Sequence, residues 1–212
     1  MEKSEVLRQI IRERKSTRSF SSEIPPPEML DRIIESCIYA PYGGATGIHL
    51  EEIRKIFVFT QGTESMTEAK ELMLAQIRRN ARKLGRLVKL LPFTKKKFGA
   101  FVNRLNGMSK NGIPSLNESP HFIVVAEKKG FPPVEKQSVA HAMENMWLTA
   151  TAEGLGFQLI SATGNMSDNL NFLKLLGLEE DKYHLEGCVI GYPKKVTEKN
   201  RSLDSNKFTK WM

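Results

Sequence analysis

The sequence predicts an α+β protein, in which a small mixed β-sheet is flanked by helices. Two observations predict this class. Short β-branched and aromatic runs alternate with longer segments whose apolar residues recur at helical spacing. The predicted helices and strands also interleave along the chain, which favours helices packed around one sheet. We expect residues 1–212 to form a single domain, with a basic helical insertion at 78–110 within it.

Two helices are predicted at the start of the chain. Residues 2–14 form the first, and their apolar positions are Val6, Leu7, Ile10 and Ile11. A polar connection at 15–22 follows. Three consecutive prolines then precede a helix at 28–39, where a fixed φ suits the first turn. Pro41 and the two glycines after Tyr42 end this second helix.

The remaining elements follow from the same periodicities. Strands are predicted at 55–60, 122–126, 158–161 and 187–192, and helices at 65–81, 136–152 and 170–176. Gly154 and Gly177 follow two of these helices, where glycine is a common C-terminal residue. No internal repeat is visible.

The net charge of +8 belongs to one segment of the chain. Eleven lysines and arginines and no acidic residue lie between Glu71 and Glu118, so the rest of the chain carries about −3. Cys37 and Cys188 are isolated, which excludes a CxxC pair, a zinc ribbon and an in-chain iron–sulfur cluster. We expect no metal, no secretory signal and no membrane-spanning helix, and a cytoplasmic location.

The basic segment predicts an amphipathic cationic helix. Its apolar residues recur at i, i+3, i+4 and i+7, and they are Leu84, Leu87, Val88 and Leu91. Three interpretations remain open: a helix packed on the core with a solvated basic face, a lid that attracts an anionic substrate or electron donor, or contact of 82–97 with an anionic membrane surface. Nucleic acid is not expected, because no recognition module is visible and aromatic residues are sparse.

A cluster of cations and hydroxyls connects the first two helices, with the sequence R-K-S-T-R-S-F at residues 14–20. Arginine offers a planar fork and serine a rotating hydroxyl, so this loop can converge on an anion such as a phosphate. A solvated loop whose cations complement the end of the first helix explains the same residues.

This cluster, followed by Ile24 and a helix ending in A-P-Y-G-G at 40–44, resembles the opening of the nitroreductase family of FMN enzymes. In that family an Arg-x-Ser-x-Arg/Lys element binds the flavin. The resemblance places Arg14 on the phosphate, Lys15 and Ser16 on the phosphate and ribityl chain, and Arg18 near N1 and O2 of the ring. A cation there stabilises the negative charge of reduced flavin. The loop at Pro41, Tyr42, Gly43 and Gly44 is then expected near the ring.

Two further blocks resemble the same family. Residues 140–157 are similar to its long central helix ending in Gly-Leu-Gly. The resemblance implies that Ile160, Ser161 and Ala162 pass the central ring, with a backbone N–H of Ser161 or Ala162 near N5. Near the end of the chain, Gly191-Tyr192 precedes Lys199 and Arg201, which are similar to the family's second phosphate contact.

The chain departs from the family pattern after Pro41. The family's Asn, Gln and Trp of this loop are missing, and the chain has Y-G-G-A-T-G-I-H at 42–49 instead. Tyr42 is a candidate to stack near the flavin or to donate its hydroxyl to substrate, and a surface tyrosine is the alternative. This departure bears on substrate preference more than on flavin binding, which depends on the cationic clusters.

The resemblance implies an intertwined homodimer with FMN at the interface. Its face on helix 136–152 would include Met143, Met146 and Trp147, while His141 and Asn145 serve packing or a dimer contact. We expect an FMN-dependent oxidoreductase that transfers hydride from NAD(P)H to a nitroaromatic, quinone or similar acceptor by a ping-pong mechanism, with no catalytic side chain. A dedicated reductive enzyme such as a dehalogenase-like member, or a non-catalytic basic surface-binding protein with a degenerate flavin site, remains as an alternative.

Overall fold

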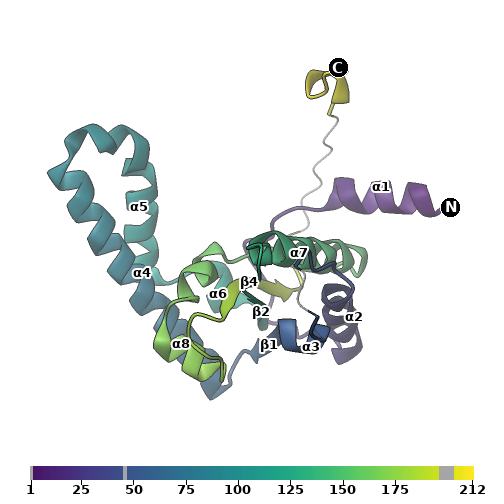
Figure 1. The fold of residues 1–212 in the computed structure, drawn as a ribbon, viewed down its shortest axis with the longest axis horizontal. Helices are drawn as coiled ribbons and strands as arrows, with labels where there is room; N and C mark the ends of the chain where they lie inside the picture. Colours follow the sequence, from purple (N-terminus) through teal and green to yellow (C-terminus); the bar gives the residue numbers. More distant parts are fainter. Residues whose placement is uncertain (1, 45–46, 196–202) are drawn as a thin grey trace.

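The computed structural model describes residues 2–44, 47–195 and 203–212. Figure 1 shows a helix-wrapped sheet from which a helical hairpin and the first helix extend. The α-helices are α1 (Lys3–Glu13), α2 (Pro27–Ile38), α3 (Leu50–Ile53), α4 (Glu64–Leu90), α5 (Lys95–Asn111), α6 (Pro114–Glu118), α7 (Glu135–Ala152) and α8 (Leu170–Leu175). The strands are β1 (Arg54–Thr60), β2 (His121–Lys128), β3 (Gly156–Leu159) and β4 (Tyr183–Gly191), and short 3-10 turns lie at 92–94, 161–166 and 205–207.

The sheet has four strands in the order β1-β2-β4-β3, and each neighbouring pair is antiparallel. The α+β class is confirmed, but the mixed pairing that we predicted is not found among these strands. Helix α7 connects β2 to β3, which run in the same direction, and β4 inserts between them. The two strands joined by this crossover are therefore not neighbours, as in a split βαβ unit. A parallel contact does occur as an isolated bridge between Ser16 and Phe157.

The core is divided by the sheet into two apolar clusters. Alternate residues of β2 point to opposite faces, as the pleat of a strand requires. Phe122, Val124 and Ala126 join the cluster formed with α4 and α8. Ile123 and Val125 join the cluster formed with α2 and α7. Seven of the eight β2 residues are buried, as expected for the apolar run from which a strand was predicted at 122–126.

Helix α7 corrects one of our predictions about the dimer. Its Met143, Met146 and Trp147 were expected to form part of a subunit contact, but all three are buried in the core of the single chain, with exposures of 3%, 0% and 8%. Trp147 stacks on Phe157 of β3 with ring centroids 5.0 Å apart. Asn145 donates to the carbonyl of Ser36 at 3.1 Å and so ties α7 to α2.

The basic segment forms a helical hairpin, α4–α5, that projects from the body of the molecule (Figure 1). We predicted a helix at 65–81 and a second one around 84–91, whereas a single helix of 27 residues spans both. Gly85 does not interrupt it, because an interior glycine costs a helix only about 1 kcal/mol. Thr63 caps its start by accepting from the N–H of Met66 at 3.2 Å. Arg78 donates to the carbonyl of Ser109 at 3.0 Å and joins the two helices.

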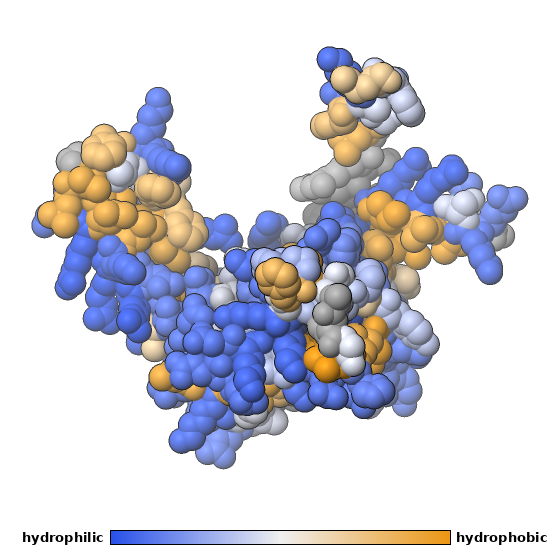
Figure 2. All heavy atoms as spheres, in the orientation of Figure 1, coloured by the Kyte–Doolittle hydropathy of each residue, from blue (hydrophilic) through white to orange (hydrophobic). Residues whose placement is uncertain are grey.

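Helix α1 leaves its apolar side uncovered. It extends from the body in Figure 1, and it has no buried residue. Val6, Leu7 and Ile11 are 36%, 52% and 50% exposed, and Figure 2 shows hydrophobic residues on the surface of this helix. Within the described residues no helix has both the length and the apolar character needed to cross a bilayer. The apolar side of α1 is therefore a surface that the rest of the described chain does not bury.

Both cysteines are free and buried, and burial suppresses their ionisation. Burial raises the pKa of Cys37 to about 12 and that of Cys188 well above the ordinary thiol value. Since the thiolate is the reactive form, we expect neither thiol of the native protein to react with iodoacetamide at pH 8. Mass spectrometry should show two modified cysteines after denaturation in urea. Modification of either cysteine in the native protein would contradict this burial.

Candidate functional site

The predicted phosphate-binding segment lies across the start of β3. Ser16 pairs with Phe157, and the N–H of Thr17 donates to the carbonyl of Phe157 at 2.9 Å. The strand residue beside this crossing is Gly156, where a Cβ atom would lie 2.6 Å from the Cγ2 atom of Thr17. The buried Thr17 side chain therefore packs directly against Gly156 and leaves no space for a larger residue here. This crossing fixes Ser16 and Arg18 on either side of the buried threonine, and both side chains are exposed.

The same segment continues along the end of β4. The N–H of Ser21 donates to the carbonyl of Tyr192 at 2.8 Å, and the N–H of Lys194 donates to the carbonyl of Ser19 at 3.1 Å. Phe20, between them, is 1% exposed and anchors the segment in the core. The N-terminal cluster and the chain that leaves β4 are thus adjacent. Lys199 and Arg201, the predicted second phosphate contact, lie outside the described residues.

Arg14 is held by helix α7. Its guanidinium lies 4.3 Å above the ring of Trp147 and 3.1 Å from a carboxylate oxygen of Glu144. The indole N–H of Trp147 donates to the carbonyl of Lys15 at 3.3 Å. These contacts orient the guanidinium, because stacking on an aromatic face suits its planar charge. They also give Arg14 an acidic neighbour that the sequence did not reveal.

The residues predicted to face the flavin ring line a cavity at the other end of β3. Ile160, Ser161 and Ala162 belong to the wall of a space of about 330 Å³. The N–H of Ile160 donates to the carbonyl of Gly187 at 2.7 Å, whereas Ser161 is exposed. Gln158 contributes to the same wall, and its side-chain oxygen is buried without a hydrogen-bond partner in the described structure. This acceptor is free to accept a hydrogen bond from a bound molecule or from water.

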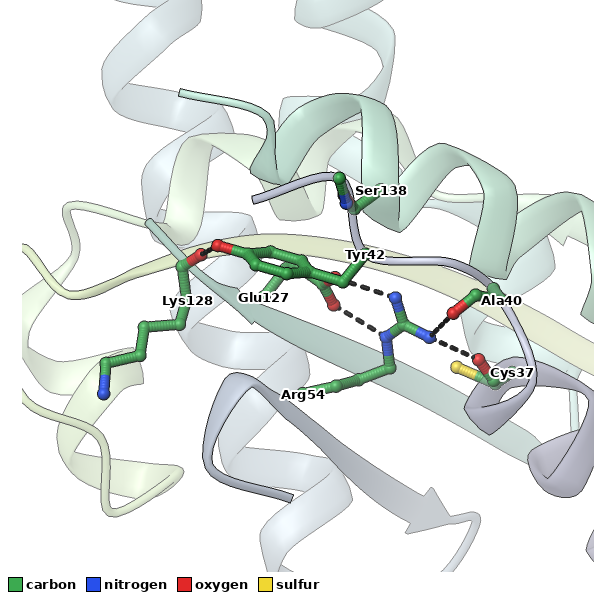
Figure 3. A network of polar contacts seen from close by, with 8 residues as sticks. Cys37, Ala40, Tyr42, Arg54, Glu127, Lys128 and Ser138 are labelled. Atoms are coloured by element: carbon green, nitrogen blue, oxygen red, sulfur yellow. Dashed lines mark hydrogen bonds and ion pairs between the residues drawn. The ribbon is translucent and has the colours of Figure 1, made fainter. Parts of the chain in front are cut away.

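The loop at Pro41–Gly44 is organised by Tyr42, as Figure 3 shows. The Tyr42 hydroxyl donates to the carbonyl of Lys128 at 3.3 Å, and the N–H of Gly43 donates to the hydroxyl of Ser138 at 3.1 Å. The Tyr42 ring packs against Gly44, and a Cβ atom on Gly44 would lie only 2.6 Å from a ring carbon. A larger residue at position 44 would therefore displace the tyrosine. Burial raises the pKa of Tyr42 above its ordinary value. The hydroxyl that we considered for substrate is thus directed to a backbone carbonyl.

A buried ion pair beneath this loop was not predicted from the sequence. Arg54 and Glu127 are 5% and 0% exposed and form two hydrogen bonds, at 2.7 and 2.8 Å. The same guanidinium donates to the carbonyls of Cys37 and Ala40 at 2.7 and 2.9 Å, at the end of α2 (Figure 3). Burial alone would lower the pKa of Arg54, but the hydrogen bonds and charge of Glu127 raise it above its ordinary value. The pair satisfies the carbonyls that end α2 and holds the start of the Pro41–Gly44 loop.

The Pro41–Gly44 loop and the N-terminal cluster contact helix α7 at different places. Helix α7 contacts the N-terminal cluster at Trp147 and the Pro41–Gly44 loop at Ser138. Ser138 and Trp147 are nine positions apart, which corresponds to roughly 14 Å along the helix axis. In contrast, the cluster crosses the start of β3, and the Ile160–Ala162 segment follows directly after the end of the same strand.

Comparison with protein families identifies the family to which the chain belongs. The model of the nitroreductase family matches residues 11–192, which include the N-terminal cluster, both ring-facing segments and all four strands. The chain belongs to the nitroreductase family. Among curated proteins no significant match was found.

Solved structures share this fold over almost the whole chain at low sequence identity. A nitroreductase with bound FMN from Bacteroides fragilis has a TM-score of 0.70 and 20% identity, covering 97% of this chain and 98% of the other. A nitroreductase with bound FMN from Desulfitobacterium hafniense has a TM-score of 0.69 and 21% identity, covering 98% of both chains. A BluB-like flavoprotein from Clostridium difficile has a TM-score of 0.72 and 16% identity, covering 100% of this chain and 99% of the other. These similarities establish the family fold.

Proposed function

We propose that this nitroreductase-family protein binds FMN along β3, from the Arg14–Arg18 cluster to the Ile160–Ala162 cavity. The observation that carries the proposal is the geometry of this strand. Ser16 pairs with Phe157, three residues before Ile160, so the two ends of the predicted site lie roughly 10 Å apart along the strand. One bound molecule with an anionic end and a ring can contact both. Structural relatives with bound FMN support the choice of this molecule.

The residues present fit the chemistry of FMN. Arg14, Lys15, Ser16 and Arg18 supply cations and a hydroxyl for the phosphate and the polar edge of the ring. Gln158 lines the same cavity as Ser161 and Ala162, and its unpartnered side-chain oxygen would accept from a donor on the bound group. Ser161 or Ala162 would offer a backbone N–H near N5. Lys199 and Arg201 would complete the phosphate contact.

The proposed activity is that of an FMN-dependent NAD(P)H oxidoreductase. Bound FMN supplies hydride chemistry at N5, by which electrons pass from NAD(P)H to a nitroaromatic, a quinone or a similar oxidised acceptor in a ping-pong cycle. The chain itself binds and orients the ring, and the cation of Arg18 favours its reduced, negatively charged state. No side chain needs to act as a nucleophile, and the two thiols are buried and protonated.

We propose further that the working unit is a homodimer, with residues 1–212 as one FMN-binding domain in each subunit. The exposed apolar side of α1 supports this, because a monomer seldom leaves such a helix face uncovered. The separation of Pro41–Gly44 from the N-terminal cluster also supports it. In a dimer the loop of one subunit would complete the flavin site of the other. A cytoplasmic location agrees with two free thiols.

Purified protein is expected to be yellow and to release about one FMN per subunit on denaturation. Anaerobic addition of NADH or NADPH should bleach the flavin, and an oxidised acceptor should restore its colour. Steady-state rates with varied donor and acceptor should give the parallel double-reciprocal lines of a ping-pong cycle. Colourless protein that also fails to bind added FMN would overturn the proposal in favour of a basic surface-binding protein.

A further inference from the structure

The helical hairpin and the segment after β3 enclose a second, larger space. A cavity of about 960 Å³ lies along α4 and α5 and adjoins the cavity of about 330 Å³ beside Ser161. The two share four lining residues, Asn80, Phe101, Leu105 and Asn165. The two spaces are therefore adjacent, and we refer to them together as the cleft. It runs from the proposed flavin ring outward along α4 as far as Leu90.

This cleft combines cations with apolar side chains. Arg79, Arg82, Lys83 and Arg86 line it, and no ion pair is found for any of them within the described part of the chain. Their neighbour Arg78 contrasts with them, because it is used to join the hairpin. Between the four cations the same wall presents apolar residues, namely Leu84, Leu87, Leu90, Phe101 and Leu105.

We infer that this cleft binds an anionic amphipathic small molecule: an aromatic or other apolar body that carries a carboxylate, sulfonate or phosphate. The apolar residues would cover the body, and the cations would pair with the acid group. The absence of acidic residues from the sequence between Glu71 and Glu118 leaves the positive potential of the cleft unopposed by its own segment. Fixed cations beside an apolar wall discriminate against a neutral analogue, which gains the apolar contact alone.

The position of the cleft assigns a role to this ligand. Because the cleft opens at Ser161, its occupant reaches the proposed hydride-transfer position, and we assign it as the oxidised acceptor; this assignment rests on the proposed function. A polar dinucleotide fits the same wall poorly, since it would leave five apolar side chains uncovered. The substrate class is therefore an acidic aromatic acceptor, such as a nitrobenzoate or a quinone sulfonate.

Binding is tested first without catalysis, by using two fluorescent probes that differ in one charge. 1-Anilinonaphthalene-8-sulfonate carries the acid group, and N-phenyl-1-naphthylamine is the same ring system without it. We expect Arg82→Gln combined with Arg86→Gln to weaken the sulfonate at least about tenfold, since charged hydrogen bonds are lost. The neutral probe should change less than about twofold. Phe101→Ser should weaken both probes.

The matched control is Lys95→Gln combined with Lys96→Gln. These lysines are exposed on the same hairpin but do not line the cleft. Both double variants remove two positive charges, so the loss of net charge is identical. If the control weakened the sulfonate as much as the arginine variant did, general electrostatics would explain the binding and the inference would fail. Equal loss of both probes in the arginine variant would also overturn it.

Kinetics then identify the ligand's role. The ratio of kcat/KM for 4-nitrobenzoate to that for 4-nitrobenzyl alcohol should fall about tenfold in the arginine variant, with FMN content unchanged. A raised KM for NADPH with an unchanged ratio would assign the cleft to the donor and overturn the acceptor assignment. FMN lost from this variant would mean that the cleft holds the cofactor. If the protein binds both probes as expected but contains no FMN, the anion-binding cleft is supported and the proposed function is contradicted.

Discussion

Replacing Arg54 by methionine is expected to lower the free energy of unfolding by about 3–5 kcal/mol, the usual cost of breaking a buried ion pair. The substitution leaves the carboxylate of Glu127 buried without a counter-charge, and it removes the donors for the carbonyls of Cys37 and Ala40. The loss is measured by urea denaturation at one protein concentration and with FMN in fixed excess, because a bound cofactor or partner adds to the apparent stability.

Two comparisons separate burial from the simple loss of an ion pair. Arg32 and Glu153 also form two hydrogen bonds, at 2.6 and 2.8 Å, but the Arg32 side chain is half exposed. Arg32→Met should therefore change stability little. The double variant Arg54→Met with Glu127→Leu should recover most of the stability lost by Arg54→Met alone, since it removes the unpaired charge. A double variant as unstable as the single one would show that the carbonyl contacts, and not the carboxylate, dominate.

Most elements of this fold follow from local patterns in the sequence, which placed all four strands and the longer helices α1, α2, α4 and α7 near their observed positions. The helices α3, α5 and α6 were not predicted individually. The buried run at 122–126 and the apolar periodicity of 136–152 depend on neighbours a few residues apart. The position of β4 in the sheet does not depend on such local neighbours. β4 lies between β2 and β3 because its residues pack into both apolar clusters of the folded chain. The sequence of one strand does not show which strands will be its neighbours in the sheet.

The same distinction applies to the site. The cations and hydroxyls at 14–18 are contiguous, so the sequence alone was sufficient to identify them as a candidate anion site. Arg54 and Glu127 are 73 residues apart and lie at the ends of strands, where a charged residue is ordinarily solvated. The Glu144 carboxylate beside Arg14 was missed for a similar reason, because α7 reaches the N-terminal loop only in the folded chain. The cleft along α4 could not be predicted from the sequence, because it forms only when the hairpin brings Phe101 of α5 opposite the α4 cations.

Ser16→Ala combined with Arg18→Ala is expected to weaken FMN binding by roughly 30-fold to 1000-fold. The range corresponds to the loss of one neutral and one charge-assisted hydrogen bond. The fold should survive, because both side chains are exposed and the backbone contacts of Thr17 with Phe157 remain. The dissociation constant is measured by adding protein to free FMN and following the change in flavin fluorescence. Circular dichroism of the same samples reports the fold.

The position of Arg18, and not merely its charge, is what this measurement must resolve. Arg12→Ala removes the same charge from the last turn of α1, six residues away, and should leave FMN binding nearly unchanged. Arg18→Lys keeps the charge but loses the planar fork, so it should fall between the wild type and Arg18→Ala. If Arg12→Ala weakened FMN as much as Arg18→Ala, the segment would act only as a diffuse positive field. The close crossing of Ser16–Arg18 over Gly156 would then serve folding alone, and the group that contacts N1 and O2 of the flavin ring would have to lie elsewhere.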